Sequence, residues 1–225
     1  MQRKIVLDTE TSGLDYKQGH RVIEIGAVEL DSNYIETHNI FHCYINPERD
    51  ISKEAYKVHG LSRTFLSDKP KFQEIADKFL QFIDGAQLII HNASFDIHFL
   101  NAELFKIRKS AIPNTCVIDT LILARKRFPK ERVNLDALCY KFNIDTSDRN
   151  YHGALKDAKL LALVYNRMML GMQAALLDDS KKEVIISNRS TSIKNTAIVQ
   201  PTRDEIRQHQ QLLSKISAHL VKNLH

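Results

Sequence analysis

The sequence predicts an α/β domain with a mixed five-stranded sheet flanked by helices. Three observations lead to this fold class. Strand-like apolar runs come first along the chain, helical segments then alternate with strands, and the share of apolar and charged residues is ordinary for a globular protein. With 225 residues, the chain can bury a full core in one domain and have length left over.

Three strands are expected near the start of the chain. Residues 5–7 are an aliphatic run, which is typical of a buried strand. Residues 22–30 alternate between apolar and polar side chains, and residues 35–45 follow a turn signal at 31–33. Such close succession predicts a three-stranded meander.

Helices and strands alternate in the rest of the core. Helical spacing or capping signals predict helices at residues 52–58, 72–83, 94–105, 120–128, 134–142 and 153–171. Two short strands are expected at 87–90 and 115–118. Gly60 is the expected cap after the first helix, and Pro129 separates the fourth helix from the fifth.

The character of the sequence changes after the last core helix. We expect a core domain over residues 1–175, a flexible linker over 176–202 and a C-terminal helical segment over 203–225. Ser, Thr and Asn dominate the linker, whereas Thr202 and Glu205 form a capping-box pattern that opens the last helix. An amphipathic helix on a tether is expected to dock on a partner or on its own domain.

Charge and cysteine usage bound the class of protein. The formal net charge is +5, and the eight basic and three acidic residues after residue 180 account for all of it. Cys43, Cys116 and Cys139 form no CxxC pair, so neither a zinc site nor a disulfide framework is indicated, and a reducing cytoplasmic compartment fits best. No apolar run approaches about 18 residues, and the first residues lack signal-peptide features, so no membrane association is expected.

Asp8 and Glu10 stand at the end of the first apolar strand. Their spacing of two places both side chains on one face of the strand. Two close carboxylates repel each other and are costly to bury, and a bound cation is the usual relief. The alternative is a strand-to-turn junction with two solvated acids.

Two further acids and a histidine are candidate site residues. Asp96 falls in the first turn of the helix after the fourth strand, where Ser94 could be the cap and Asp96 a plain capping acid. Asp157 shares a helical stripe with Leu161, and a carboxylate facing the core needs a cation or strong donors. His152 would face elsewhere if it were helical, so it is expected in a mobile loop before this helix.

Together these segments resemble the three sequence blocks of the DEDDh exonuclease family, the DnaQ-like group of the ribonuclease H-like fold. The blocks read Asp8-Thr9-Glu10-Thr11, Asn92-Ala93-Ser94-Phe95-Asp96 and His152-Gly153-Ala154-Leu155-Lys156-Asp157, in the family's order. The resemblance covers residues 1 to about 172. It implies a ribonuclease H-like fold and 3′→5′ hydrolysis that releases nucleoside 5′-monophosphates.

The resemblance also implies roles for the site residues. Asp8, Glu10, Asp96 and Asp157 would hold two divalent ions, Mg²⁺ or Mn²⁺, with Asp8 bridging them. His152 would take the proton from the attacking water. Contacts to the terminal nucleotides would come from Thr11, Gly13, Leu14, Val58, His59, Asn92 and Phe95. Each of these contact residues also has an interpretation as a core or turn residue.

The segments between the blocks resemble those of the proofreading subunits of bacterial replicative polymerases. These segments are Asp119-Thr120-Leu121 and Asn134 to Cys139. In that branch, residues 203–225 would bind the polymerase (alpha) subunit, and Gln173–Leu177 loosely matches a sliding-clamp-binding peptide. A small accessory subunit is a further candidate partner, the substrate would be a single-stranded or frayed DNA 3′ end, and the location would be the cytoplasmic replisome.

Three questions stay open at the level of sequence. The same domain could trim RNA 3′ ends, or it could act mainly as a structural stabiliser of a polymerase. The basic residues Arg125, Lys126, Arg127, Lys130 and Arg132 could follow a phosphate backbone, or they could be a solvated helix end.

Overall fold

A mixed five-stranded sheet forms the centre of the fold, as predicted. The computed structural model describes residues 2–147 and 151–179, with side chains described as far as residue 171. The strand order is β3-β2-β1-β4-β5. The bounds are β1 (Lys4–Thr11), β2 (Val22–Leu30), β3 (Glu36–Tyr44), β4 (Gln87–Ile90) and β5 (Val117–Asp119). The first three strands pair antiparallel, and β4 and β5 continue the sheet in parallel beside β1.

The six helices predicted between residues 52 and 171 are all present, together with one short helix that was not predicted. Their bounds are α1 (Lys53–His59), α2 (Arg63–Leu66), α3 (Phe72–Ile83), α4 (Ala93–Lys106), α5 (Thr120–Arg127), α6 (Leu135–Lys141) and α7 (Ala154–Asp179). The prediction omitted α2 and the 3₁₀ turn η1 (Tyr16–Gln18), because one turn is too short to show a hydrophobic period. The fifth strand starts two residues later than predicted, because a second 3₁₀ turn, η2, occupies Asn114–Cys116.

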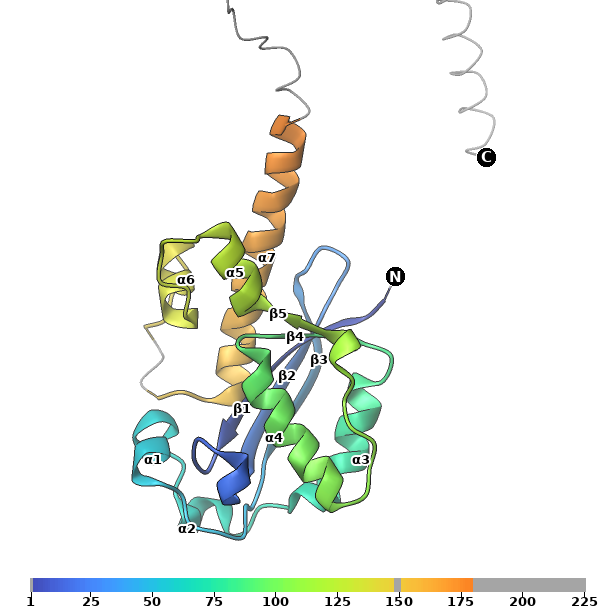
Figure 1. Cartoon of the computed structure of the whole chain (residues 1–225), viewed down its shortest axis with the longest axis vertical. Helices are drawn as coiled ribbons and strands as arrows, with labels where there is room; N and C mark the ends of the chain where they lie inside the picture. Colours follow the sequence, from blue (N-terminus) through green and yellow to red (C-terminus); the bar gives the residue numbers. More distant parts are fainter. Residues whose placement is uncertain (1, 148–150, 180–225) are drawn as a thin grey trace, which may run out of the picture. The chain divides into compact units, whose positions relative to one another are not determined.

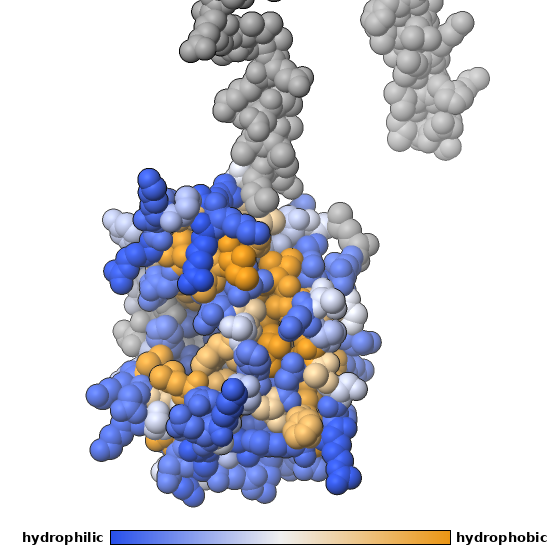
Figure 2. Space-filling model, in the orientation of Figure 1, coloured by the Kyte–Doolittle hydropathy of each residue, from blue (hydrophilic) through white to orange (hydrophobic). Residues whose placement is uncertain are grey.

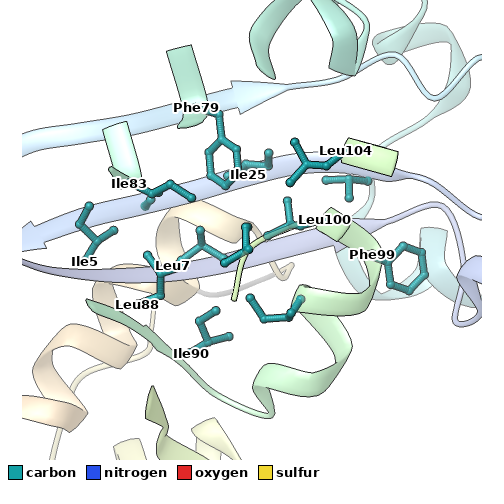
Figure 3. Close-up of a cluster of buried hydrophobic side chains, with 14 of the residues drawn as sticks. Ile5, Leu7, Ile25, Phe79, Ile83, Leu88, Ile90, Phe99, Leu100 and Leu104 are labelled. Atoms are coloured by element: carbon teal, nitrogen blue, oxygen red, sulfur yellow. The ribbon is translucent and has the colours of Figure 1, made fainter. Parts of the chain in front are cut away.

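Helices cover both faces of the sheet, and alternate residues of β1 face the two layers. Ile5 and Leu7 pack with residues of α3 and α4, whereas Val6 packs with residues of α7. Figure 1 shows these two layers, and Figure 3 shows the α3–α4 side of the core around Ile5 and Leu7. Each such buried aliphatic side chain stabilises the fold by about 1.5–3 kcal/mol. Because side chains alternate along a strand, Asp8 and Glu10 face α7 as Val6 does.

α7 is longer than predicted. The prediction ended it at Gly171, but the helix continues to Asp179 and includes the first four residues of the predicted linker. Ala, Leu, Met and Gln, which are strong helix formers, fill this stretch. The loosely matched clamp peptide, Gln173–Leu177, thus lies within the helix. The remainder of the linker and residues 203–225 lie outside the described residues.

Arg127 joins α5 to α7. Its guanidinium donates a hydrogen bond to the carbonyl oxygen of Met168, and a β-carbon on Gly171 would come within 2.3 Å of its Nη2 atom. Gly171 therefore leaves room for the guanidinium against the helix. The hydrogen bond to Met168 fixes the Arg127 side chain against α7, whereas whether the basic cluster follows a phosphate backbone stays a prediction.

The face of the molecule in Figure 2 is largely polar but includes apolar groups. In the view of Figure 2, charged and polar side chains surround a few separate groups of apolar ones. Within the described ranges, no helix is both long and apolar enough to cross a membrane. Cys43, Cys116 and Cys139 are free thiols, in line with the prediction that they form no disulfide framework.

Candidate active site

Asp8 and Glu10 lie at the open end of the central strand. The parallel pairing of β1 with β4 ends at Val6, opposite Ile89, and the two acids follow beyond that point. Glu10 is buried and Asp8 is half-buried. Both face the layer that contains α7, so an acidic side chain at the start of α7 can lie close to them.

Asp96 reaches the site from the opposite layer. It lies in the first turn of α4, with only 4% of its surface exposed, and Thr9 Oγ1 donates a hydrogen bond to its Oδ1 atom at 2.6 Å. Thr9 sits between Asp8 and Glu10 in β1 and therefore faces α4. The first sequence block thus carries Asp8 and Glu10 on one face of the strand and, on the other face, the hydroxyl of Thr9 that holds Asp96 in place.

The start of α4 differs from the sequence prediction. Ser94 is inside the helix, and the N-cap is Asn92, which has a left-handed backbone conformation and forms no capping hydrogen bond with its side chain. The carboxylate of Asp119 replaces a local cap, because it accepts hydrogen bonds from the backbone N–H groups of Asn92 and Ala93. It also caps α5, so one acid at the end of β5 fixes the starts of two helices.

Asp157 and His152 complete the set from α7 and the segment before it. Asp157 is in the first turn of α7 and is 4% exposed. His152 precedes the helix, as predicted, and its Nδ1 atom lies 3.0 Å from Asp157 Oδ2. The backbone N–H of His152 also donates to the carbonyl oxygen of Val58 at 3.0 Å. The histidine therefore folds back onto the acid from which helical geometry would have separated it.

The acids form one electrostatic cluster. The pKa of Asp8 is raised well above its ordinary value, first by burial and then by the negative charges of Asp96, Glu10 and Asp157. Burial raises the pKa of Asp96 to about 7, although the hydrogen bond from Thr9 favours the ionised form. Carboxylates in this state gain most from a cation that neutralises them together.

The residues present fit a divalent metal centre. Ligand atoms of Glu10, His152 and Asp157 all lie within 4.8 Å of one another, which is a spacing that one ion can bridge. Asp8 lies close enough to Glu10, Asp96 and Asp157 for their charges to raise its pKa, after burial. Carboxylate oxygens are the ligand type that Mg²⁺ and Mn²⁺ prefer. The four acids and the histidine that were predicted from three separate blocks are thus brought to one place.

The predicted substrate-binding residues divide into two groups. Leu14 is 78% exposed and Val58 is about half exposed, so both can contact a ligand. Asn92 is also exposed. His59 is buried, accepts a hydrogen bond at Nδ1 from the Leu61 N–H, and has its pKa lowered mainly by burial.

The second group has clear structural roles. Thr11 Oγ1 donates to the Gly13 carbonyl oxygen at 2.7 Å, and a β-carbon on Gly13 would collide with the His20 ring. Phe95 is half-buried and packs on Phe99, with ring centroids 4.9 Å apart. For Gly13, the need for glycine is explained by His20, so close approach of a ligand backbone is not required to account for it.

Sequence reasoning overlooked three residues that organise the site. They are Thr9, Asp119 and Gly26, which stands opposite Asp8 in the β1–β2 pairing. Asp119 carried a usable signal, since an acid directly before a predicted helix is a preferred N-cap. The roles of Thr9 and Gly26 depend on contacts between distant segments, which one sequence does not reveal.

Comparisons with known proteins agree with this geometry. A family model described as "Exonuclease" matches residues 5–165. The chain is 50% identical over 224 residues to the DNA polymerase III subunit epsilon of Rickettsia conorii, covering 95% of this chain and 96% of the relative. It is 43% identical over 228 residues to the subunit of the same name from Escherichia coli, covering 95% and 93%.

Solved structures share the fold. Exonuclease X in complex with 5′ overhanging duplex DNA aligns with a TM-score of 0.60 and 23% identity, covering 76% of this chain and 93% of that one. The nuclease domain of 3′hExo, a DEDDh family member bound to rAMP, aligns with a TM-score of 0.63 and 20% identity, covering 76% and 92%. The mixed sheet and its flanking helices therefore match an exonuclease fold.

Proposed function

The chain belongs to the exonuclease family, and we propose that it acts as the 3′→5′ proofreading exonuclease of a bacterial replicative DNA polymerase. Relatives that align with nearly the whole chain are epsilon subunits of DNA polymerase III. Membership among them implies that this chain binds DNA and works with a polymerase. The observation that carries the proposal is the meeting of four carboxylates and a histidine at the open end of β1.

Enzymes of this type depend on divalent metal ions. In our proposal, Asp8, Glu10, Asp96 and Asp157 would hold two of them, Mg²⁺ or Mn²⁺. When bound, such ions supply Lewis-acid stabilisation of the attacking and leaving oxygens of a phosphodiester. The supporting observation is that the pKa of Asp8 is raised, first by burial and then by the charges of the neighbouring acids, so the metal-free site is electrostatically unfavourable.

His152 is the proposed general base. Its imidazole is half-exposed and is oriented by Asp157 through the 3.0 Å contact at Nδ1 and by the backbone bond to Val58. A ring nitrogen of an imidazole can accept a proton, so His152 would take it from the attacking water. The products would be a nucleoside 5′-monophosphate and a strand shortened by one residue.

The 3′-terminal nucleotide would contact the exposed apolar side chains beside the acids. Leu14 follows the end of β1, and Val58 is tied through its carbonyl oxygen to His152. Any of the four bases can pack against such apolar groups, as proofreading of every 3′ end requires. His59, Thr11, Gly13, Asn92 and Phe95 would then shape the pocket around it.

Partners beyond the DNA strand belong to the same proposal. Residues 203–225 would bind the polymerase (alpha) subunit, with the linker keeping the nuclease at high effective concentration near the primer end. A sliding clamp could engage Gln173–Leu177, and a small accessory subunit could bind the core domain. The replisome would place the protein in the cytoplasm.

Hydrolysis of defined 3′ ends tests the reaction and the substrate together. The purified full chain is given a matched primer–template, the same primer with a mismatched 3′ nucleotide, and an RNA strand of the same sequence. We expect nucleoside 5′-monophosphates from both DNA ends, faster from the frayed mismatch, and slower release from RNA. Asp157→Asn is the matched control and should be inactive on all three.

The same assay separates the two alternatives. Preferential hydrolysis of RNA would favour the trimming of RNA 3′ ends. Equal inactivity of the natural chain and the Asp157→Asn variant would favour a purely structural role. For the tail, capture of the polymerase subunit is compared between the full chain and a chain ending at Asp179, and unchanged capture would contradict the tail's proposed role.

A further inference from the structure

One more buried carboxylate lies beside the predicted cluster. Glu24, in β2, is 2% exposed and stands directly opposite Glu10 in the β1–β2 pairing. Side chains at directly opposite positions of antiparallel strands lie on the same face of the sheet. Glu24 therefore faces the same layer as Asp8 and Glu10, although none of the three family blocks includes it.

His42 holds the Glu24 side chain in place. His42 belongs to β3 and stands opposite Gly26, two residues along β2 from Glu24. Its Nε2 atom lies 2.8 Å from Glu24 Oε1. A carboxylate buried to this extent needs a partner, and this contact supplies one from the edge of the sheet.

Glu24 also lies against the turn that carries the proposed base. A β-carbon on Gly153 would stand 3.8 Å from Glu24 Oε2 and 3.9 Å from Oε1. Gly153 connects His152 to the first residue of α7, Ala154. The carboxylate thus packs beneath the short segment that sets the position of the imidazole relative to Asp157.

The charge of Glu24 is felt inside the cluster. Glu24 stands directly opposite Glu10, and Asp8 stands opposite Gly26, two residues further along β2, so the negative charge of Glu24 adds to that of these two acids. A negative group near a cation site but outside its ligand set raises the local affinity for cations. The same charge repels the neighbouring carboxylates when no cation is present.

We propose that Glu24, held by His42, is a positioning residue of the nuclease site that supports Glu10 and the His152–Gly153 turn and strengthens cation binding through its charge. This inference rests on the proposed function, because it requires that the four acids bind divalent cations. It goes beyond that function by assigning a role to a fifth acid and its histidine partner.

The charge-removing variant Glu24→Gln tests the proposal. Glutamine keeps the size of the side chain and an oxygen for His42, so packing is preserved. Binding of Mn²⁺ to the full chain is measured by titration calorimetry, and Tm is measured in a chelator. We expect the affinity for Mn²⁺ to fall about tenfold while the metal-free Tm stays equal or rises.

Two results would overturn the inference. One is an unchanged affinity for Mn²⁺. The other is a lower affinity accompanied by a lower metal-free Tm, because that combination reports structural damage alone. Loss of a purely structural residue would not lower the affinity for Mn²⁺ while leaving the metal-free Tm equal or higher.

Glu103→Gln is the matched control. Glu103, in α4, is also 2% exposed, but its partner is Arg21, whose Nη2 donates to Oε2 at 2.7 Å. Breaking this ion pair should lower Tm and leave the affinity for Mn²⁺ within about twofold. If the natural chain binds no Mn²⁺ and hydrolyses no 3′ end, the proposed function itself fails. If the natural chain does both and Glu24→Gln binds Mn²⁺ with the same affinity, the inference alone fails.

Discussion

Gly26 in β2 and Leu155 in α7 approach each other so closely that no side chain fits between them. A β-carbon on Gly26 would come within 2.1 Å of the Leu155 backbone nitrogen. Because Gly26 is the partner of Asp8 in the β1–β2 pairing, this approach brings the first turn of α7, with Asp157, over the acids of β1. The close packing of α7 on the sheet at the site therefore depends on glycine at position 26.

Replacing Gly26 by alanine should push the start of α7 away from the sheet. We expect a loss of stability on the order of 1–3 kcal/mol, as for other overpacked positions, and a large fall in kcat. Thermal unfolding and single-turnover hydrolysis measure the two effects. Gly153→Ala is the stability control, since its β-carbon would meet only Glu24 at an ordinary 3.8 Å; an equal loss of Tm in both variants would refute the packing explanation.

Replacing His152 by alanine should reduce turnover without preventing DNA binding. Removal of a general base typically costs about 10²–10⁴-fold in rate. The side chain is 42% exposed, so the fold should tolerate its loss. Turnover at saturating metal is compared with binding of a 3′-ended oligonucleotide by fluorescence anisotropy. Turnover near that of the natural chain would remove His152 from the role of base.

The metal-free protein should lose stability as pH rises from about 4 to about 7. Burial raises the pKa of Asp96 from 3.8 to about 7. The folded state therefore holds a proton that the unfolded chain releases earlier, and the stability linked to that proton disappears as pH passes through the folded-state pKa. Tm in a chelator, measured at several pH values, should decline across this window. Asp96→Asn should flatten the decline; an unchanged slope would contradict the raised pKa.

Metal removal should affect activity and stability together. A chelator should abolish hydrolysis, and Mg²⁺ or Mn²⁺ should restore it. Because cations bind only the folded site, a concentration of 100 times Kd should stabilise the fold by about 2.7 kcal/mol. Calorimetric Tm with and without Mn²⁺ checks this, with Asp157→Asn as the variant that should respond least. Hydrolysis that persists after exhaustive chelation would rule out the proposed metal dependence.

Much of the fold was predictable because its elements are long and periodic. Apolar runs predict β1 and β2, and helical stripes predict the longer helices. The site acids lie at the ends of the strands or in the first turns of the helices. Single-turn elements such as α2 carry no period, and the extension of α7 past Gly171 runs against the usual tendency of glycine to end a helix.

The finer structure of the site was not predictable, because it depends on contacts between segments far apart in the chain. The hydrogen bond from Thr9 to Asp96 and the capping of α4 by Asp119 each join residues that the sequence separates widely. The contact between His152 and Asp157 was missed for another reason. Helical geometry separates residues five apart, whereas the segment before α7 is not helical and folds back.

The order in which the acids occur along the chain has a consequence for protein synthesis. β1 supplies Asp8 and Glu10 near the start, whereas Asp157 arrives only with α7, the last described element. A growing or truncated chain that lacks α7 cannot assemble the cluster, however well its sheet has formed. Under the proposed function, a chain without α7 would therefore lack nuclease activity.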